Sequence, residues 1–231
     1  MKHSPRTEID GFIESRNLRE LLSKAGELHG HLCSYLTYGV MAACLAVHEL
    51  EVKSTGMEEV VAIVETNNCF SDGVQMVAGC SFGNNSLMYR DIGKTAVTLA
   101  RRDGTAIRIA LDPDFEDSRN DEYPEAAELW DRIIVKREEG TSEEHEKMMT
   151  LFEEMSIKEL KKSTEEMFRI KHMKITVPEY APIVASVRCS ICGEKVMENK
   201  ARVMDGKPVC IDCGRRECCI LDGKGLSMKV T

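Results

Sequence analysis

Four cysteines near the C-terminus have the spacing of a zinc site. Cys189 and Cys192 form one C-x-x-C pair, and Cys210 and Cys213 form a second pair after an interval of 17 residues. Two such pairs can place four thiolates tetrahedrally around one Zn²⁺ ion. A redox dithiol would need only one pair. We therefore predict a structural zinc site with these four cysteines as ligands.

A second group of potential metal ligands lies near the N-terminus. His29, His31 and Cys33 fall within five residues, and Cys69 follows a predicted buried strand. Imidazole and thiolate groups suit transition metals such as zinc, nickel or iron. Two alternatives stay open: these residues are surface histidines and buried thiols, or Cys33 and Cys69 cycle through a disulfide. The adjacent histidines favour metal binding over disulfide exchange.

Three charged residues could support a ligand bound at this second group. Glu65 ends the predicted strand, and Asp72 lies at the start of the helix expected after it. Lys94 could orient an anionic small molecule, although it could equally be a solvated side chain. The G-K-T sequence around it is not a phosphate-binding loop, because Met88 stands where that loop needs glycine. No residue can be assigned a catalytic role.

The remaining cysteines are weaker candidates for metal ligands. A predicted helix separates Cys80 from Cys69 by about 16 Å, which is too far for both to bind one ion. Cys44 lies among alanines and leucine on an apolar helix and is expected in the core. Cys218 and Cys219 follow the second C-x-x-C pair and stay unassigned.

Charge and hydropathy exclude several classes of protein. The chain has 231 residues and a formal net charge of -8, and 19 acidic residues stand against eight basic ones between positions 112 and 166. Without a clear basic patch, nucleic-acid binding is not expected. The longest purely apolar run, 40–47, is too short to cross a bilayer, and no secretory signal is recognisable. We expect a cytoplasmic protein with reduced cysteines and no membrane partner.

The helices and strands expected from the sequence occur in an order typical of an α+β fold. Two prolines, Pro178 and Pro182, mark a linker between an α+β core domain, residues 1–182, and a zinc-binding domain, residues 183–231. The second domain is too small to be stable without a metal or disulfides. Helices are expected at 14–27, 34–50, 71–78, 125–137 and 142–164, and strands at 60–64, 96–101, 105–111 and 167–177.

Taken together, these motifs resemble the formylmethanofuran dehydrogenase FmdE family across nearly the whole chain. The shared sequence comprises H-G-H-L-C at 29–33, 65–69, Asp72, Gln75, G-C-S-F-G at 79–83 and D-I-G-K at 91–94, followed by a helical segment and the two C-x-x-C pairs. One departure is that the family commonly has proline and glycine after the motif cysteine, whereas this chain has Ser34 and Tyr35.

The resemblance implies an α+β core, a homodimer and a C-terminal treble-clef zinc finger. It also implies a metal-binding cleft at His31, Cys33 and Cys69, with His29 as a further candidate. The family's name refers to molybdenum and tungsten enzymes of one-carbon metabolism and methanogenesis. No pterin site or ferredoxin-type cysteine run is recognisable, so an accessory role to such an enzyme complex is expected rather than its redox chemistry.

A docking protein is the alternative from a different class. The zinc-binding domain would then bind a protein or nucleic acid while the core only dimerises. Support for this alternative comes from five basic residues of the tail: Arg188, Lys195, Arg202, Arg215 and Arg216. Whether the core cleft is catalytic is not decided by the sequence.

Overall fold

The computed structural model describes residues 4–230, apart from the side chains of residues 119–121. The chain divides into two compact units, Met1–Pro178 and Glu179–Thr231. We describe each unit by itself. None of the helices in the described residues has the length and apolar character needed to span a membrane.

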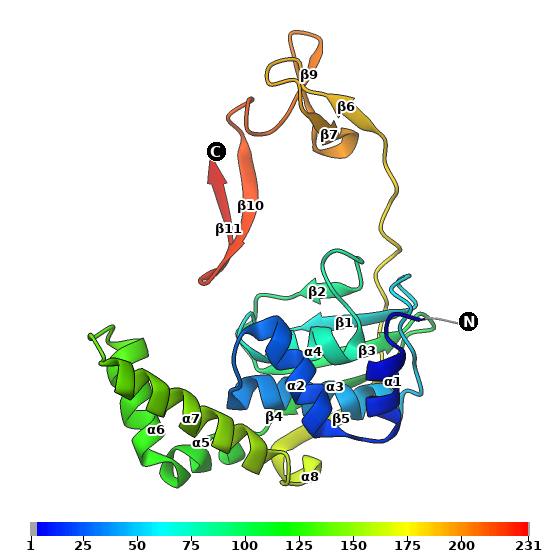
Figure 1. The fold of residues 1–231 in the computed structure, drawn as a ribbon. Coiled ribbons are helices and arrows are strands. Elements are labelled where there is room, and N and C mark those ends of the chain that lie inside the picture. The colour runs from blue at the N-terminus through cyan, green and yellow to red at the C-terminus, as the bar shows by residue number, and fades with distance from the viewer. Residues whose placement is uncertain (1–3, 231) are drawn as a thin grey trace. The chain divides into compact units, whose positions relative to one another are not determined.

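The first unit contains a five-stranded sheet, which lies behind helices α2, α3 and α4 in the view of Figure 1. Its strand order is β2-β1-β3-β4-β5, and only the β1–β2 pair is parallel. Strands β1 and β3 are buried along nearly their whole length, whereas β5 at the edge is mostly exposed. The strands are β1 (Val60–Val64), β2 (Leu87–Tyr89), β3 (Ala96–Arg101), β4 (Thr105–Leu111) and β5 (Phe168–Lys174).

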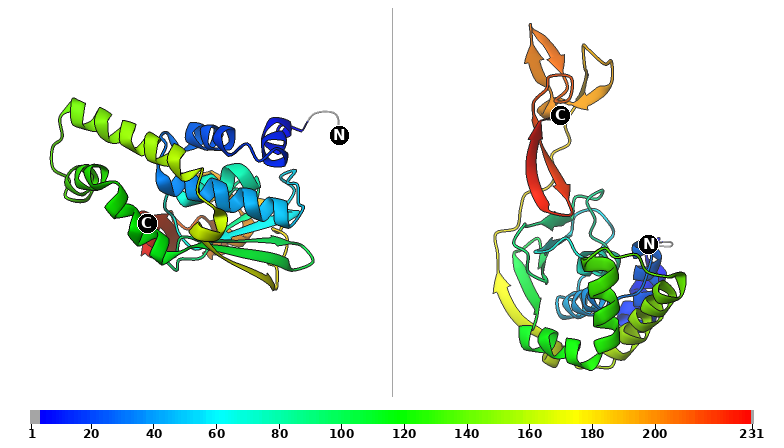
Figure 2. Two further views of the ribbon diagram at one scale, coloured as in Figure 1. Left: turned by 90° about the horizontal axis from the view of Figure 1, so that it is seen from below. Right: turned by 90° about the vertical axis from the view of Figure 1, so that its left-hand side faces the viewer.

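Four helices lie over one face of this sheet (Figures 1 and 2). Helix α3 is buried along most of its length, because its many small side chains let other elements approach it closely. The apolar side chains of α2, α3 and α4 meet those of β1, β3 and β4 in a single core. The four helices are α1 (Thr7–Glu14), α2 (Leu18–His29), α3 (Ser34–Glu49) and α4 (Phe70–Ala78).

Two glycines set the contact between α3 and α4. A Cβ atom added to Gly39 would lie 2.0 Å from the carbonyl oxygen of Phe70. A Cβ atom added to Gly73 would lie 2.5 Å from the carbonyl oxygen of Leu36. The two backbones therefore touch near the N-terminal ends of both helices, which brings the residues preceding each helix together.

A helical arm between β4 and β5 completes the first unit. It comprises α5 (Pro113–Glu122), α6 (Pro124–Leu129), a π-helix η1 (Trp130–Val135), α7 (Ser142–Glu159) and α8 (Thr164–Met167). Helix α7 begins at a capping box in which Thr141 and Glu144 exchange side-chain and backbone hydrogen bonds. The arm is tied to α3, because the Tyr38 hydroxyl donates to the fully buried carboxylate of Glu159 at 2.6 Å.

The structure confirms the α+β class and differs from the sequence expectations at several boundaries. The helix expected at 14–27 begins at Leu18 and ends at His29, because Arg16 has a φ of 51° and Asn17 accepts a hydrogen bond from the Glu20 backbone as the cap of α2. Helix α4 begins at Phe70, so Cys69 itself occupies the N-cap position. Helix α1, strand β2 and helix α5 were not predicted; β2 has only three residues, and α5 has no clear apolar period.

The second unit contains three two-stranded sheets and very little core. Among its described residues, Cys189 and Val209 are the buried hydrophobic side chains. Such a unit cannot be stable through apolar burial alone. Its elements are β6 (Ser186–Arg188), β7 (Lys195–Met197), the 3-10 helix η2 (Glu198–Lys200), β8 (Arg202–Met204), β9 (Lys207–Val209), β10 (Glu217–Asp222) and β11 (Gly225–Val230).

Candidate metal centre

The ends of three helices bring four potential metal ligands together in the first unit. His29 is the last residue of α2, Cys33 is the N-cap of α3 and Cys69 is the N-cap of α4. Gly30 reverses the chain between them with a φ of 93°, a conformation that favours glycine. One ligand atom from each of His29, His31, Cys33 and Cys69 lies within 4.8 Å of the others.

His29 is held in an orientation suited to a metal ligand. Its Nδ1 lies 2.7 Å from Oδ2 of Asp72, and Gln75 Nε2 donates to the other oxygen of that carboxylate at 2.9 Å. A carboxylate only accepts, so Nδ1 carries the proton and Nε2 keeps its lone pair. Nε2 is buried and has no hydrogen-bond partner among the described residues. A metal ion would satisfy this nitrogen.

Exchanging Asp72 for asparagine is expected to lower metal affinity at this cluster by about 10- to 100-fold, because loss of the carboxylate charge weakens its hold on the ring N–H of His29. Isothermal titration of the metal-depleted chain with Zn²⁺ would measure the change. The matched control is Glu20→Gln, which removes an exposed carboxylate from α2. Equal affinities in both variants would refute the role given to Asp72.

The pKa values of the two thiols in the cluster shift in opposite directions. A hydrogen bond from the Cys33 thiol lowers the pKa of Cys69 to about 6, and the neighbouring His29 ring acts in the same direction against the effect of burial. The same hydrogen bond and burial raise the pKa of Cys33. Cys69 is therefore the thiol of the pair that loses its proton more readily. A cation bound beside it would favour ionisation of Cys33 as well.

His31 is less constrained than His29. Its ring centroid lies 4.4 Å from that of His29, and burial, with a smaller contribution from His29, lowers the pKa of His31. Neutral imidazole is the form that binds metals. No hydrogen bond to the His31 ring is found among the residues that the structure describes.

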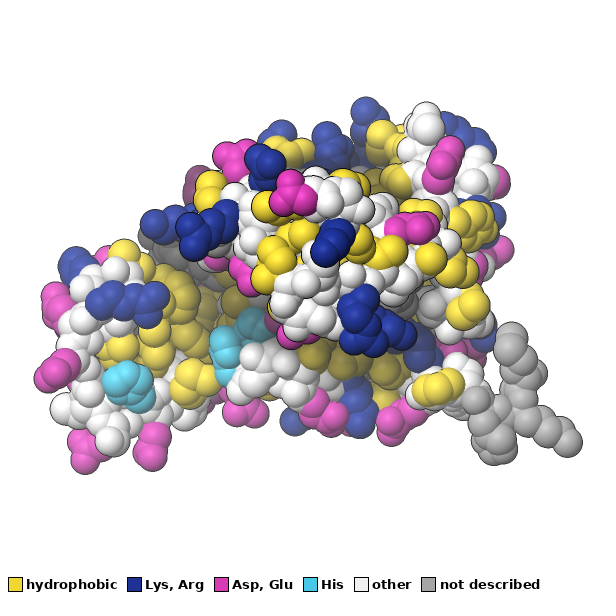
Figure 3. Space-filling view, turned by 90° about the horizontal axis from the view of Figure 1, so that it is seen from above, with side chains coloured by type: hydrophobic (Ala, Val, Ile, Leu, Met, Phe, Trp, Pro, Cys, Tyr) yellow, Lys and Arg dark blue, Asp and Glu magenta, His cyan; other side chains and the backbone are white. Residues whose placement is uncertain are grey.

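A pocket of about 570 Å³ opens beside the cluster. Its volume is in the range of small-molecule sites. In the space-filling view, hydrophobic side chains gather in a hollow next to histidine side chains (Figure 3). One side is formed by the cluster and the first turn of α3, and the opposite side by the helical arm; the lining residues are His31, Cys33, Ser34, Tyr35, Cys69, Tyr123, Ala126, Ala127, Trp130, Phe152 and Met155.

Tyr35, at one of the two positions where this chain departs from the common family pattern, forms part of the pocket wall. Its hydroxyl donates to the carboxylate of Glu116 on α5. This contact links the first turn of α3 to the helical arm.

The other charged residues singled out in the sequence lie in different surroundings. The Glu65 carboxylate accepts two hydrogen bonds of 2.7 Å from Arg108 on β4, and these bonds lower the pKa of Glu65. Lys94 is exposed, and its backbone N–H donates to the Glu65 carbonyl at 2.9 Å. Neither residue is among those that line the pocket. Of the three, Asp72 alone contacts the cluster directly.

The remaining core cysteines are packing residues, as expected. Cys44 is 4 % exposed, and burial raises its pKa to about 11. Cys80 is fully buried, its thiol lies 3.7 Å from the carbonyl oxygens of Val60 and Ala78, and burial raises its pKa to about 12.

The second unit brings its own four sulfur atoms together. Cys189, Cys192, Cys210 and Cys213 offer ligand atoms within 4.8 Å of one another. Backbone N–H groups, that of Cys210 foremost, lower the pKa of Cys189 to about 6. This geometry and donor set fit a tetrahedral zinc ion. The neighbouring Cys218 and Cys219 lie on β10 and do not belong to this group.

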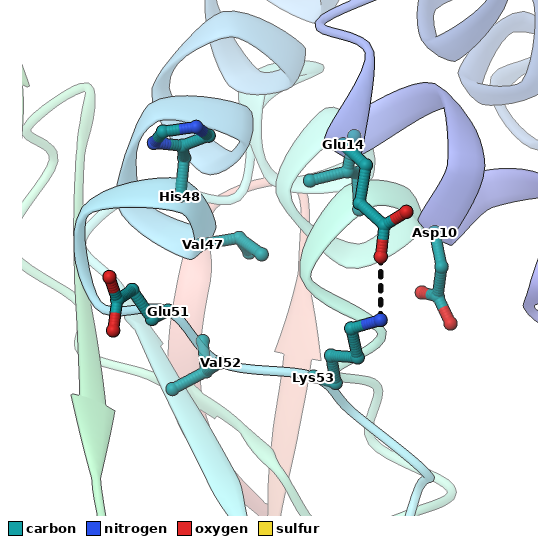
Figure 4. A pocket seen from close by; sticks show the side chains of 8 residues that line it. Asp10, Glu14, Val47, His48, Glu51, Val52 and Lys53 are labelled. Carbon is teal, nitrogen blue, oxygen red and sulfur yellow. Dashed lines mark hydrogen bonds and ion pairs between the residues drawn. The ribbon is translucent and has the colours of Figure 1, made fainter.

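A further pocket of about 320 Å³ lies at the other end of α3 (Figure 4). Glu14 Oε1 and Lys53 Nζ form an ion pair there at 2.6 Å, and Nδ1 of His48 lies 3.2 Å from a guanidinium nitrogen of Arg16. The described residues of this pocket contain no group of three convergent ligand atoms. It is therefore not a candidate metal site.

Sequence reasoning missed the wall of the pocket formed by the arm. Trp130 is 45 % exposed and lines the pocket with Phe152. Its position at the start of a π-helix is typical of functional sites, but a π-helix has no clear sequence signature. The arm's convergence on the cluster depends on tertiary contacts that no local pattern reveals.

Two known proteins are similar to this chain. A curated relative from Archaeoglobus fulgidus, named "Probable S-adenosyl-L-methionine-binding protein", is 39% identical over 212 residues, covering 88% of this chain and 56% of the relative. The chain thus spans about half the length of that relative. A crystal structure of a tungsten formylmethanofuran dehydrogenase FmdE-like protein from Syntrophus aciditrophicus matches with a TM-score of 0.57 and 22% identity, over 85% of this chain and 91% of the other. This match concerns the fold.

Family models account for both units. Residues 182–217 match the prokaryotic dksA/traR C4-type zinc finger. Residues 28–169, which include the Cys/His cluster and the helical arm, match the family described as "FmdE, Molybdenum formylmethanofuran dehydrogenase operon". The chain therefore belongs to the FmdE family and carries a C4-type zinc finger after its core.

Proposed function

We propose that this protein binds a transition metal with His29, His31, Cys33 and Cys69 and presents it to a small molecule in the adjoining pocket. The observation that carries this proposal is the buried, unpartnered Nε2 of His29 beside two thiols. Two thiolates and two imidazoles suit zinc, nickel or iron. When bound, the metal would supply Lewis acidity at the edge of the pocket.

Different residues of the chain would have separate roles around such a metal. Asp72 orients His29, and Cys69 supplies the thiol that loses its proton more readily. The arm residues Trp130 and Phe152 line the pocket on the side opposite the cluster. The same arrangement would serve a metal carrier or a catalyst.

Metal stoichiometry in two lengths of chain tests this proposal. The full chain, purified anaerobically without chelators, should contain two metal ions by elemental mass spectrometry. A chain ending at Pro182 should contain one, and adding Cys33→Ser to the full chain should also leave one. Retention of two ions in the Cys33→Ser variant would refute the core site. One ion in the full chain and none after truncation would favour the docking function instead.

We further propose that the protein is an accessory of a molybdenum or tungsten enzyme in one-carbon metabolism, acting in the cytoplasm as a homodimer. Membership of the FmdE family supports this association. The proposal predicts co-purification with such an enzyme at native expression levels and a dimeric mass in solution.

S-adenosyl-L-methionine binding is a second candidate function. The name of the Archaeoglobus fulgidus relative suggests it, and Trp130 and Phe152 offer aromatic faces for an adenine ring. Equilibrium dialysis with S-adenosyl-L-methionine tests it directly. Binding that is unaffected by Cys33→Ser would favour this candidate over metal presentation.

A further inference from the structure

We propose that the pocket binds a neutral organic thiol with an aromatic body, whose sulfur takes the metal-coordination position of His31. This inference rests on the proposed metal site and names the ligand class that the site would accept. It follows from the charge of the pocket, the shape of its aromatic wall and the different restraints on the two histidines.

The pocket favours an uncharged ligand. None of the described residues that line it is Lys, Arg, Asp or Glu. Its polar groups are the cluster itself and the hydroxyl groups of Ser34, Tyr35 and Tyr123. Burying a charged group against such a wall would leave that group without a partner, which is costly. Phosphates and free carboxylates are therefore poor ligands for the enclosed part of the pocket.

An aromatic body fits the wall formed by the arm. The rings of Trp130 and Phe152 have centroids 5.9 Å apart and planes inclined at 56°. Met155 lies beside them, 7 % exposed. A third ring placed against this pair would gain offset or edge-to-face contacts. The pocket volume of about 570 Å³ exceeds what a single ring needs, so a larger body is also accepted.

His31 is the ligand that can leave the metal. His29 Nδ1 lies 2.7 Å from Asp72, whereas no hydrogen bond to the His31 ring is found among the described residues. His31 also lines a separate hollow of about 320 Å³ between α2 and α7, where Ser23 and Glu153 offer polar partners for a displaced ring. A swing into this hollow would free one coordination position facing the larger pocket.

A sulfur donor is the best match for the freed position. A metal already bound by two thiolates and one imidazole prefers a further soft donor. The incoming thiol would bind as a thiolate, and its proton would pass to solvent. No electron transfer is needed for this exchange.

Cobalt-loaded full chain and phenylmethanethiol provide the test. Co²⁺ in the cluster reports ligand exchange through its visible absorption, and Trp130 is the only tryptophan of the chain, so its fluorescence reports occupancy of the pocket. Phenylmethanethiol should change both signals under anaerobic conditions. Phenylmethanol, which lacks the sulfur, and 4-mercaptobenzoate, which adds a charge, should each bind at least tenfold more weakly. The Cys33→Ser variant, in which only the zinc finger binds cobalt, should show no thiol-dependent change in absorption.

Three variants separate the parts of the inference. Phe152→Ala should weaken phenylmethanethiol binding about tenfold without changing cobalt content. His31→Ala should retain cobalt and bind the thiol at least as tightly, whereas His29→Ala should lose cobalt from the core.

Three experimental results would contradict different parts of the proposal. A cluster that binds cobalt but whose spectrum ignores phenylmethanethiol would overturn this inference and leave the proposed metal site standing. Loss of cobalt in His31→Ala would overturn the exchange at His31. Absence of cobalt from the cluster of the unaltered chain would overturn the proposed function itself.

Discussion

Replacing Cys210 by serine is expected to remove one metal ion from the full chain and to unfold residues 179–231, while the first unit keeps its fold. Cys210 is one of the four sulfur ligands that converge within 4.8 Å. The second unit buries almost no apolar surface, so the metal supplies most of its stability. Structural zinc contributes about 10 to 16 kcal/mol in comparable small domains. Loss of a ligand should therefore abolish the unit's folded state.

Amide hydrogen exchange and metal analysis measure this outcome together. Residues of β6 to β9 should lose their protection, and the strands of the first unit should retain theirs. Cys219→Ser is the matched control, because this exposed cysteine lies on β10 outside the sulfur cluster. A Cys210→Ser chain with unchanged zinc content and protection would contradict the assignment of this ligand.

Substituting alanine for Gly39 is expected to destabilise the first unit by about 3 kcal/mol or more and to weaken metal binding at the core cluster. The added Cβ atom would lie 2.0 Å from the Phe70 carbonyl oxygen, a clash with backbone that cannot be relieved by a rotamer change. Helices α3 and α4 would have to separate. Since Cys33 and Cys69 begin these two helices, their sulfur atoms would move apart as well.

Urea unfolding and zinc titration of the same Gly39→Ala sample test both effects. Gly11→Ala serves as the control, because a Cβ atom there meets nothing within 4 Å and alanine favours the helical conformation of α1. The control should be unchanged or slightly more stable. Wild-type stability in Gly39→Ala would show that α3 and α4 do not pack through this glycine.

The sequence predicts the ligands of both sites because their signals are local. Cysteine pairs at short spacing indicate a zinc site without any knowledge of the fold, and the H-G-H-L-C run places three donors within one turn of chain. Cys69 was joined to them through the predicted strand end at 60–64, and the structure brings its thiol to the cluster. In the two cysteine pairs and the H-G-H-L-C run a short segment determines its own geometry, whereas the position of Cys69 depends on the packing of α4 against α3.

Features that depend on distant segments were not predictable in the same way. Glu65 was a candidate to support the cluster, but its carboxylate pairs with Arg108, which lies on β4 beyond an intervening strand. The register that brings them together is set by the whole sheet. Likewise, Trp130 reaches the pocket because Tyr38 and Glu159 fix the arm against α3, and a contact between residues so far apart in the chain leaves no mark on local hydropathy.

The two clusters depend on folding in different ways, and the contact between Gly39 and Gly73 explains the difference. The core ligands on α3 and α4 come together through backbone packing, which does not require an ion, so that cluster forms as a consequence of folding and its ligands are arranged in advance. The sulfur cluster of the second unit lacks such a scaffold, so there we expect ion binding and folding of the chain to occur together. Depletion of metal in a cell should therefore leave the first unit folded with its four potential ligands still close together, whereas the second unit should become sensitive to proteolysis.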